Sequence, residues 1–268
     1  MNSLNIKKYG HGENVLVAIH GLGSASSAWD LVQPELEKRF QFVTLDLPGH
    51  GDATMLATED MDPETLSKIL ASELEKSGIT KFHLIGNSLG GWIALELAAA
   101  FPDKVLSVTG VAPAGLWLKA KTHRNGELAI SRYLAKITYR LANPISKIKA
   151  LRKLGFKLVS PQWEKFTPET CAKAAIAMGS ASGYYKLWDA FLGNRFDKKI
   201  STNIPVTIIF GDTDNTLPAA NSQEKSLAPA HCRWVVLPQS GHAPMWDQVS
   251  SVVAETIKTV ETVSQPDI

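Results

Sequence analysis

The sequence has few cysteines and lacks a long hydrophobic run. Only two of its 268 residues are cysteines, Cys171 and Cys232, and they form neither a disulfide framework nor a metal-ligand spacing. The chain also lacks the roughly 18 consecutive apolar residues of a membrane span, and residues 1–8 lack the apolar run of a signal peptide. We therefore expect a cytoplasmic protein with no transmembrane segment and no bound metal.

The net charge is small but unevenly distributed. Hydrophobic residues make up 44% of the chain and charged residues 20%, which is typical of a folded globular protein, and the net charge is only +2. Residues 114–203, however, hold 17 lysines and arginines against 5 acidic residues. No nucleic-acid recognition motif accompanies this positive charge, so we expect no nucleic-acid partner.

Short apolar runs alternate with helical patterns along most of the chain. Strands are expected at residues 3–9, 15–19, 42–45, 82–85, 105–111, 204–210 and 233–237, and helices at 29–39, 63–77, 92–100 and 249–263. Residues 114–203 show only helical periodicity and many aromatics. The pattern predicts an α/β fold with a doubly wound, mostly parallel sheet. Residues 1–113 and 204–268 form its core, and 114–203 are an inserted helical lid.

One stretch joins a strand, a sharp turn and a helix around a single serine. The pattern Gly86-x-Ser88-x-Gly90 permits a tight corner, because glycine tolerates backbone angles and close approaches that a Cβ would block. The corner leaves the Ser88 hydroxyl exposed at the end of a strand and the Leu89 amide free at a helix N-terminus, where negative charge is favoured. This is the nucleophile-elbow pattern. A glycine-rich turn with an incidental serine is the alternative.

Three other strand ends carry residues that could complete a reaction centre. A glycine-rich loop follows the strand at 15–19, and we assign its Leu22 N–H as a second oxyanion donor beside that of Leu89. Acids follow the strand at 204–210, and His242 follows the last strand. Parallel strands end at one edge of a sheet, so these groups can meet there. A serine needs a histidine to take its proton and a carboxylate to orient the imidazole.

Together these motifs make the chain similar to the α/β-hydrolase superfamily along nearly its whole length. The motifs are His20-Gly21-Leu22-Gly23, Pro48-Gly49-His50-Gly51, Gly86-Asn87-Ser88-Leu89-Gly90-Gly91, Gly211-Asp212-Thr213-Asp214 and Ser240-Gly241-His242. The resemblance implies Ser88 as the nucleophile, His242 as the general base and then acid, and Asp214 as the orienting acid. Asp212 is expected to brace its turn, and His50 to shape one.

A serine nucleophile implies an acyl-enzyme, and hence a small-molecule substrate with a carboxylic ester, thioester or lactone bond. No metal or organic cofactor is needed. Three alternatives remain open: a carbon–carbon bond hydrolase of the meta-cleavage type, an acyltransferase, and a non-catalytic binding protein of the same fold. The loop at 20–24 is shorter than that of the meta-cleavage enzymes. The Ser88, Asp214 and His242 set argues against simple binding.

The inserted segment carries aromatic residues and an amphipathic pattern. Gly21, Trp117 and Trp188 are the candidate substrate-binding residues. One predicted helical face holds Ile130, Tyr133, Leu134, Ile137 and Leu141, and the opposite face holds Arg132, Lys136 and Arg140. We expect the apolar face to pack on the core and the basic face to meet water. The alternative is that the basic face steers anionic, acyl-bearing substrates or makes a peripheral contact with an anionic membrane.

Overall fold

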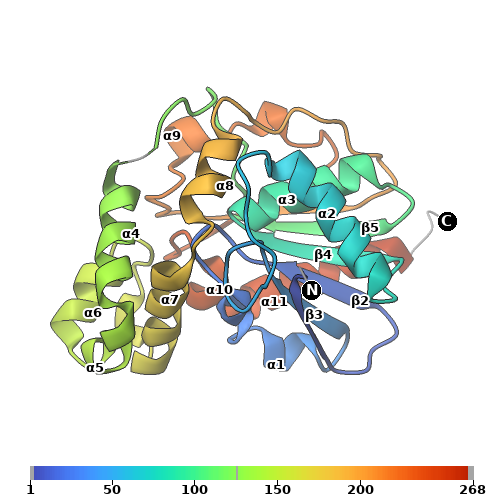
Figure 1. Ribbon diagram of the computed structural model, residues 1–268. Helices are drawn as coiled ribbons and strands as arrows, with labels where there is room; N and C mark the ends of the chain where they lie inside the picture. Colours follow the sequence, from blue (N-terminus) through green and yellow to red (C-terminus); the bar gives the residue numbers. More distant parts are fainter. Residues whose placement is uncertain (1–2, 125, 265–268) are drawn as a thin grey trace.

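The sheet is the centre of the molecule, and its strand order is that of a doubly wound fold. A computed structural model describes residues 3–124 and 126–264. Seven strands lie in the order β1-β3-β2-β4-β5-β6-β7, with β1 antiparallel to β3 and all other neighbours parallel (Figure 1). The strands are β1 (Asn5–Tyr9), β2 (Val15–Ile19), β3 (Gln41–Asp46), β4 (Phe82–Asn87), β5 (Val105–Val111), β6 (Val206–Gly211) and β7 (Arg233–Leu237). The predicted fold class is confirmed.

Helices cover both faces of this sheet. On one face, α2 (Pro63–Lys76) and α3 (Leu89–Ala100) share one buried apolar cluster with the sheet. On the other face, α11 (Val249–Glu261) packs on a second cluster. The short helices of the core are α1 (Gln33–Leu36), α9 (Ala219–Ser222) and α10 (Pro244–Asp247), with 3₁₀ turns η1 (Ser26–Trp29), η4 (Lys225–Leu227) and η5 (Thr262–Ser264). Because helices cover both faces, the parallel strands are mostly apolar.

A helical segment lies between β5 and β6, as the sequence pattern predicts. It contains α4 (Gly126–Thr138), α5 (Ala142–Ser146), α6 (Lys149–Phe156), α7 (Pro168–Ser180) and α8 (Tyr184–Phe191), with 3₁₀ turns η2 (Tyr139–Leu141) and η3 (Trp163–Lys165). Helices α4 to α7 gather at one end of the molecule, beyond the edge of the sheet (Figure 1). Helix α8 instead lies over the carboxyl ends of the central strands, where its aromatic residues join the main core.

The expected orientation of α4 is wrong, because its apolar face is exposed. The basic residue Arg132 is 5% exposed and donates from its guanidinium to the carbonyl oxygens of Gly179, at 2.9 Å, and Ala181, at 2.8 Å. The apolar Ile130 and Ile137 are 63% and 59% exposed. The physical reason is the close approach of α7: a Cβ on Gly179 would lie 2.3 Å from the Tyr139 Cβ. The buried face of α4 therefore holds an arginine that satisfies the last carbonyls of α7.

Candidate active site

Ser88 sits in a strained turn between β4 and α3. Its φ is 53° and its ψ is −117°, a conformation that non-glycine residues rarely adopt and that costs on the order of 1–3 kcal/mol. Two glycines make the turn possible by backbone contact: a Cβ on Gly86 would lie 2.3 Å from the Gly90 oxygen, and a Cβ on Gly90 would lie 2.1 Å from the Ile19 oxygen. The helix N-terminus thus presses on the end of β2. The predicted strand–turn–helix corner is present.

Backbone strain gathers at this one edge of the sheet. Among the described residues, the non-glycine positions with positive φ are Ser88, Ala112 and Gln239, at 53°, 45° and 51°. They follow the carboxyl ends of β4, β5 and β7. Strained residues persist only where the surroundings impose them, and they concentrate at functional sites. The edge that the sequence motifs single out is therefore also the strained edge of the structure.

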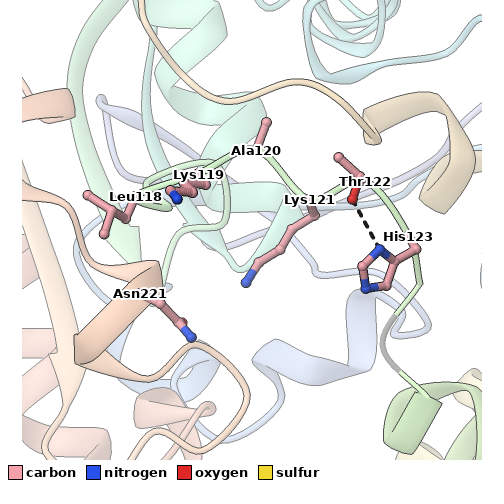
Figure 2. Close-up of a pocket in the computed structure, with 7 residues that line it drawn as sticks. All are labelled: Leu118, Lys119, Ala120, Lys121, Thr122, His123 and Asn221. Atoms are coloured by element: carbon pink, nitrogen blue, oxygen red, sulfur yellow. Dashed lines mark hydrogen bonds between the residues drawn. The ribbon is translucent and has the colours of Figure 1, made fainter.

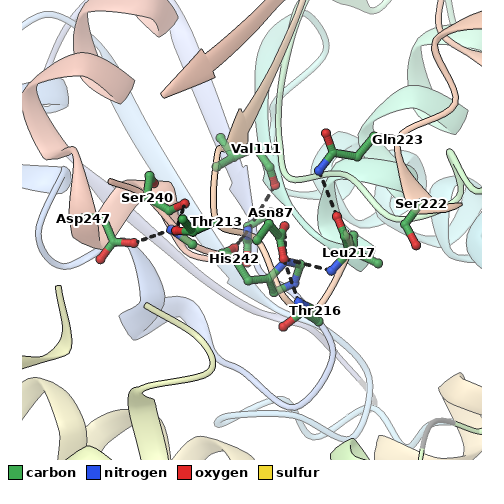
Figure 3. Close-up of polar contacts among 12 residues, drawn as sticks. Asn87, Val111, Thr213, Thr216, Leu217, Ser222, Gln223, Ser240, His242 and Asp247 are labelled. Carbon is green, nitrogen blue, oxygen red and sulfur yellow. Dashed lines mark hydrogen bonds and ion pairs between the residues drawn. The ribbon is translucent and has the colours of Figure 1, made fainter. Parts of the chain in front are cut away.

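His242 and Asp214 form a buried, directed pair at this edge. His242 Nδ1 lies 2.9 Å from Asp214 Oδ2, and the imidazole is 14% exposed while the carboxylate is fully buried. The other carboxylate oxygen accepts from the amides of Thr216, at 2.9 Å, and Leu217, at 2.8 Å (Figure 3). Burial alone would raise the pKa of Asp214, but the attraction of His242 and these hydrogen bonds outweigh it and lower that pKa. The carboxylate is thus ionised and accepts the Nδ1 proton, which leaves Nε2 available.

The neighbouring acid has a different contact. Asp212 Oδ1 accepts from the Ser240 amide at 3.2 Å, and Thr213 Oγ1 donates to the Ser240 carbonyl at 2.9 Å. These bonds tie the loop after β6 to the loop after β7. Asp212 therefore contacts the loop that carries His242, where the sequence indicated only a contact within its own turn, and the histidine is paired with Asp214.

The serine and histidine loops are joined through Asn87. Its side-chain amide donates to the carbonyls of Val111, at 3.1 Å, and His242, at 3.2 Å (Figure 3). Within the described residues, Ser88 Oγ makes no hydrogen bond with His242, so the structure links these two residues through the side chain beside the serine. In apo enzymes such catalytic contacts are often long and tighten only with substrate.

The loop at 20–24 lies against Ser88 and is held by two histidines. A Cβ on Gly21 would be 3.1 Å from the Ser88 Cβ, so this loop touches the serine. His50 Nε2 accepts from the Gly23 amide at 3.0 Å, and His20 Nε2 accepts from the Leu47 amide at 3.0 Å. Burial lowers the pKa of His20, and burial with the nearby His20 lowers the pKa of His50 to about 3. Both imidazoles are therefore neutral, as an accepting Nε2 requires.

Two backbone N–H groups beside Ser88 have no partner in the described part of the chain. These are the amides of Leu22, which follows Gly21, and Leu89, the first residue of α3. An amide at a helix N-terminus favours negative charge.

The role of His50 in holding this loop was missed from the sequence, where its place between two glycines indicated only a turn. The signal that could have found it is the shared position of two histidines at neighbouring strand ends.

The two candidate tryptophans lie in one aromatic cluster of the core. Trp117 packs edge-to-face on Trp92 with centroids 5.2 Å apart, and its Nε1 donates to the Asn194 carbonyl at 2.9 Å. Trp188 stacks on Phe191 at 5.8 Å. Trp117 and Trp188 are 3% and 6% exposed, and Trp188 Nε1 is buried with no partner among the described residues. Trp188 therefore keeps an unused donor, whereas Trp117 uses its own to hold a loop.

Residues of the helical segment contact the loops beside Ser88. A Cβ on Gly23 would lie 2.6 Å from Met178 Sδ and 2.7 Å from a ring carbon of Tyr184. The His242 amide donates to the Val159 carbonyl at 2.8 Å. Asp247 accepts from both the Gly241 amide, at 2.8 Å, and the Ser160 hydroxyl. The segment thus contacts the loops on both sides of Ser88.

One surface hollow is lined by none of the three candidate catalytic residues. Its volume is about 250 Å³, and it lies between the chain at 118–123 and Asn221 (Figure 2). The lysines and the threonine–histidine pair that surround it are distant in sequence from the reactive loops, and Ser88, Asp214 and His242 do not line it.

Among the described residues, no group of three or more His, Cys, Asp or Glu residues could hold a metal ion. The helices of the described ranges also include none with the length and hydropathy of a membrane span.

Comparison with known sequences decides the family. Residues 14–249 match the family described as alpha/beta hydrolase fold. The chain belongs to this family. It is 25% identical to the pimeloyl-[acyl-carrier protein] methyl ester esterase of Aliivibrio salmonicida. The matched region of 255 residues covers 94% of each protein.

Two further matches agree with this assignment. The chain is 26% identical to the dihydrolipoyllysine-residue acetyltransferase component of the acetoin cleaving system of Pseudomonas putida, covering 91% of this chain and 62% of that longer protein. A solved membrane phospholipase A is similar in fold, with a TM-score of 0.74, 22% identity, and coverage of 98% of this chain and 84% of that one. The protein is an α/β hydrolase, an enzyme with named esterases and lipases among its relatives.

Proposed function

We propose that this α/β hydrolase cleaves a carboxylic ester bond by way of an acyl-enzyme on Ser88. The observation that carries the proposal is the buried His242–Asp214 hydrogen bond of 2.9 Å, beside a serine held in an elbow with a φ of 53°. A binding protein does not require an oriented, ionised carboxylate behind a histidine. The neighbouring esterase among its relatives supports the same reaction class.

In this mechanism the Ser88 hydroxyl attacks the ester carbonyl carbon while His242 Nε2 takes its proton. Asp214 holds the Nδ1 proton and stabilises the imidazolium. The carbonyl oxygen becomes an oxyanion, which the free amides of Leu22 and Leu89 stabilise. The tetrahedral intermediate then collapses, and His242 gives its proton to the departing alcohol. A water molecule, deprotonated by His242, attacks the acyl-enzyme and releases the carboxylic acid and Ser88.

We infer that residues 114–203 act as a lid that shapes the acyl site. Met178 and Tyr184 pack on the loop of Gly23, and the aromatic cluster lies behind them. Trp188 Nε1, buried without a partner among the described residues, is a donor suited to a substrate oxygen. We propose Gly21, which lies against Ser88, and Trp117, which packs on Trp92 and Phe191, as further walls of this site. An apolar acyl chain with few polar groups fits these surroundings.

The direct test is hydrolysis of p-nitrophenyl esters, from acetate to palmitate, by the wild type and by Ser88→Ala. The exposed Ser201→Ala is the matched control. We expect activity to vanish in Ser88→Ala and to persist in Ser201→Ala, with a chain-length optimum set by the acyl site. Unchanged activity in Ser88→Ala would contradict the proposal. Addition of an alcohol acceptor tests the related acyl-transfer reaction, since a new ester would then replace part of the acid.

A further inference from the structure

Two helices of the inserted segment present apolar side chains to solvent. On α4 the exposed residues are Ile130, Tyr133, Leu134 and Ile137, and they recur at helical spacing on the side opposite Arg132 and Tyr139, which face α7. On and around α6 they are Ile148, Leu151, Leu154 and Leu158, with Leu154 66% exposed. Isolated exposed apolar residues are ordinary, but two helices of one segment, α4 and α6, that both expose apolar faces mark a contact surface.

Positive charge surrounds these apolar residues. The sequence from 128 to 163 contains no aspartate or glutamate. The exposed cations of this stretch are Lys136, Arg140, Lys147, Lys149, Lys153 and Lys157. A helix with an apolar face and flanking lysines lies in the interface of a bilayer, with its apolar side chains among the acyl chains and its cations at the headgroups. The charge selects a surface of opposite sign, that is, anionic lipids.

We propose that the surface formed by the exposed residues of 130–158, hereafter the α4–α6 surface, binds anionic lipid bilayers. A second copy of this chain is the other conceivable occupant. Two-fold pairing through this surface would place lysines against lysines. Residues 128–163 contain no acidic residue to neutralise them, and Glu164, just beyond that range, already pairs with Lys149 at 3.5 Å. An anionic bilayer supplies both the apolar interior and the opposite charge. The α4–α6 surface does not include Ser88, Asp214 or His242.

The geometry also connects this surface to the reactive loops. Helix α4 packs on α7, which carries Met178 against the loop of Gly23. The chain that leaves α6 reaches Val159 and Ser160, which contact the His242 loop through the His242 amide and Asp247. A bilayer held by the α4–α6 surface would therefore lie next to the segment that contacts the loops beside Ser88.

The test is co-sedimentation of the full chain with vesicles of phosphatidylcholine alone and of phosphatidylcholine mixed with phosphatidylglycerol. The Ser88→Ala variant is measured alongside, because its binding does not depend on catalysis. We expect binding to the mixed vesicles by both proteins, weakened by added salt. Absence of binding to the mixed vesicles would overturn the proposal, and it would leave the proposed ester hydrolysis untouched.

Two double variants test the surface itself. Ile137→Ser with Leu154→Ser is expected to lower vesicle partitioning at least about tenfold, because it removes two apolar side chains that would be buried in the bilayer. Lys153→Glu with Lys157→Glu is expected to lower it by a similar factor and to reduce its salt dependence. The matched controls are Leu56→Ser, at an exposed leucine outside residues 130–158, and Lys81→Glu with Lys258→Glu, at exposed lysines outside that range.

Thermal unfolding verifies that each variant is folded. Partitioning equal to that of the wild type in both double variants would refute the assignment of the surface. Sedimentation velocity without lipid measures whether the protein associates with a second copy of itself. If it does, and if Ile137→Ser with Leu154→Ser abolishes that association, the α4–α6 surface is a protein–protein interface and the proposal is overturned.

Discussion

Replacement of Glu96 by glutamine is expected to change how stability depends on pH. Glu96 lies on α3, is 5% exposed, and accepts from Trp92 Nε1 at 2.9 Å. Burial raises its pKa to about 7 despite the hydrogen bond from Trp92 and the attraction of Lys198. Below this pH the folded protein keeps a neutral carboxyl. Above it, a buried charge must form.

The magnitude follows from the difference between the two states. The ordinary pKa of a glutamate is 4.5, so between pH 4.5 and about 7 the native state binds a proton that the unfolded state has lost. Stability then falls as pH rises, by about 1.4 kcal/mol per pH unit. Across the whole window the ionisation of Glu96 costs about 3 kcal/mol. Glutamine keeps an acceptor for the Trp92 indole and removes the ionisation.

The measurement is urea unfolding of the wild type and Glu96→Gln at several pH values from 5 to 8. His50, with a pKa lowered to about 3, makes the stability of both proteins rise with pH, opposite to the effect of Glu96. Because both proteins contain His50, its contribution cancels in the difference between them, which isolates Glu96. We expect Glu96→Gln to gain up to about 3 kcal/mol relative to the wild type as pH rises through this range. The exposed Glu59→Gln is the control. A difference that stays constant with pH would refute the reasoning.

Four further substitutions, at Asp214, Asp212 and His50, separate roles at the site. Asp214→Asn is expected to lower kcat by about 10⁴, because it removes the carboxylate that orients His242. Asp212→Asn disturbs only a loop contact and should lower kcat by less than about tenfold. Steady-state kinetics on one ester compares the two variants, and equal losses of kcat would contradict the assignment of Asp214 as the orienting acid. His50→Ala leaves the Gly23 amide without its acceptor, so the free energy of unfolding should fall by about 1–3 kcal/mol and kcat with it. His50→Gln should restore part of both in chemical denaturation and rate assays, and no effect of His50→Ala would contradict its positioning role.

Much of the sheet was predictable from apolar periodicity. The runs at 15–19, 105–111 and 233–237 form strands with those bounds, because buried parallel strands are apolar on both faces. The helix expected at 29–39 is instead a 3₁₀ turn and one short α-helix. Local patterns leave such boundaries open, since tertiary contacts decide where short helices end.

The orientation of α4 could not be read from its amphipathic pattern. Hydrophobic periodicity shows that a helix has two faces, but the partner decides which face is buried. Here the partner is α7, whose Gly179 and terminal carbonyls suit Tyr139 and the guanidinium of Arg132. A buried arginine with two backbone acceptors has no signature in a single sequence. The same limit hid the contact between His50 and Gly23, because it joins two loops that are distant along the chain.

The candidate reactive residues were accessible from sequence for a physical reason. Strand ends of a parallel sheet meet at one edge, so an elbow serine, an acid and a histidine after three different strands are brought together by the topology. The resemblance already implied Asp214, and not Asp212, as the partner of His242, and the structure shows that contact at 2.9 Å. The lengths of the loops after β6 and β7 determine which acid reaches the imidazole.

The most direct measurement of the central claim is covalent labelling by a fluorophosphonate, followed by mass mapping of peptides. An activated serine attacks the phosphorus and expels fluoride, whereas an ordinary hydroxyl does not. We expect one adduct, on Ser88, that blocks ester hydrolysis and does not form in His242→Ala. Ester hydrolysis that survives the reagent with Ser88 unlabelled, or an adduct on another serine that accompanies inactivation, would contradict it.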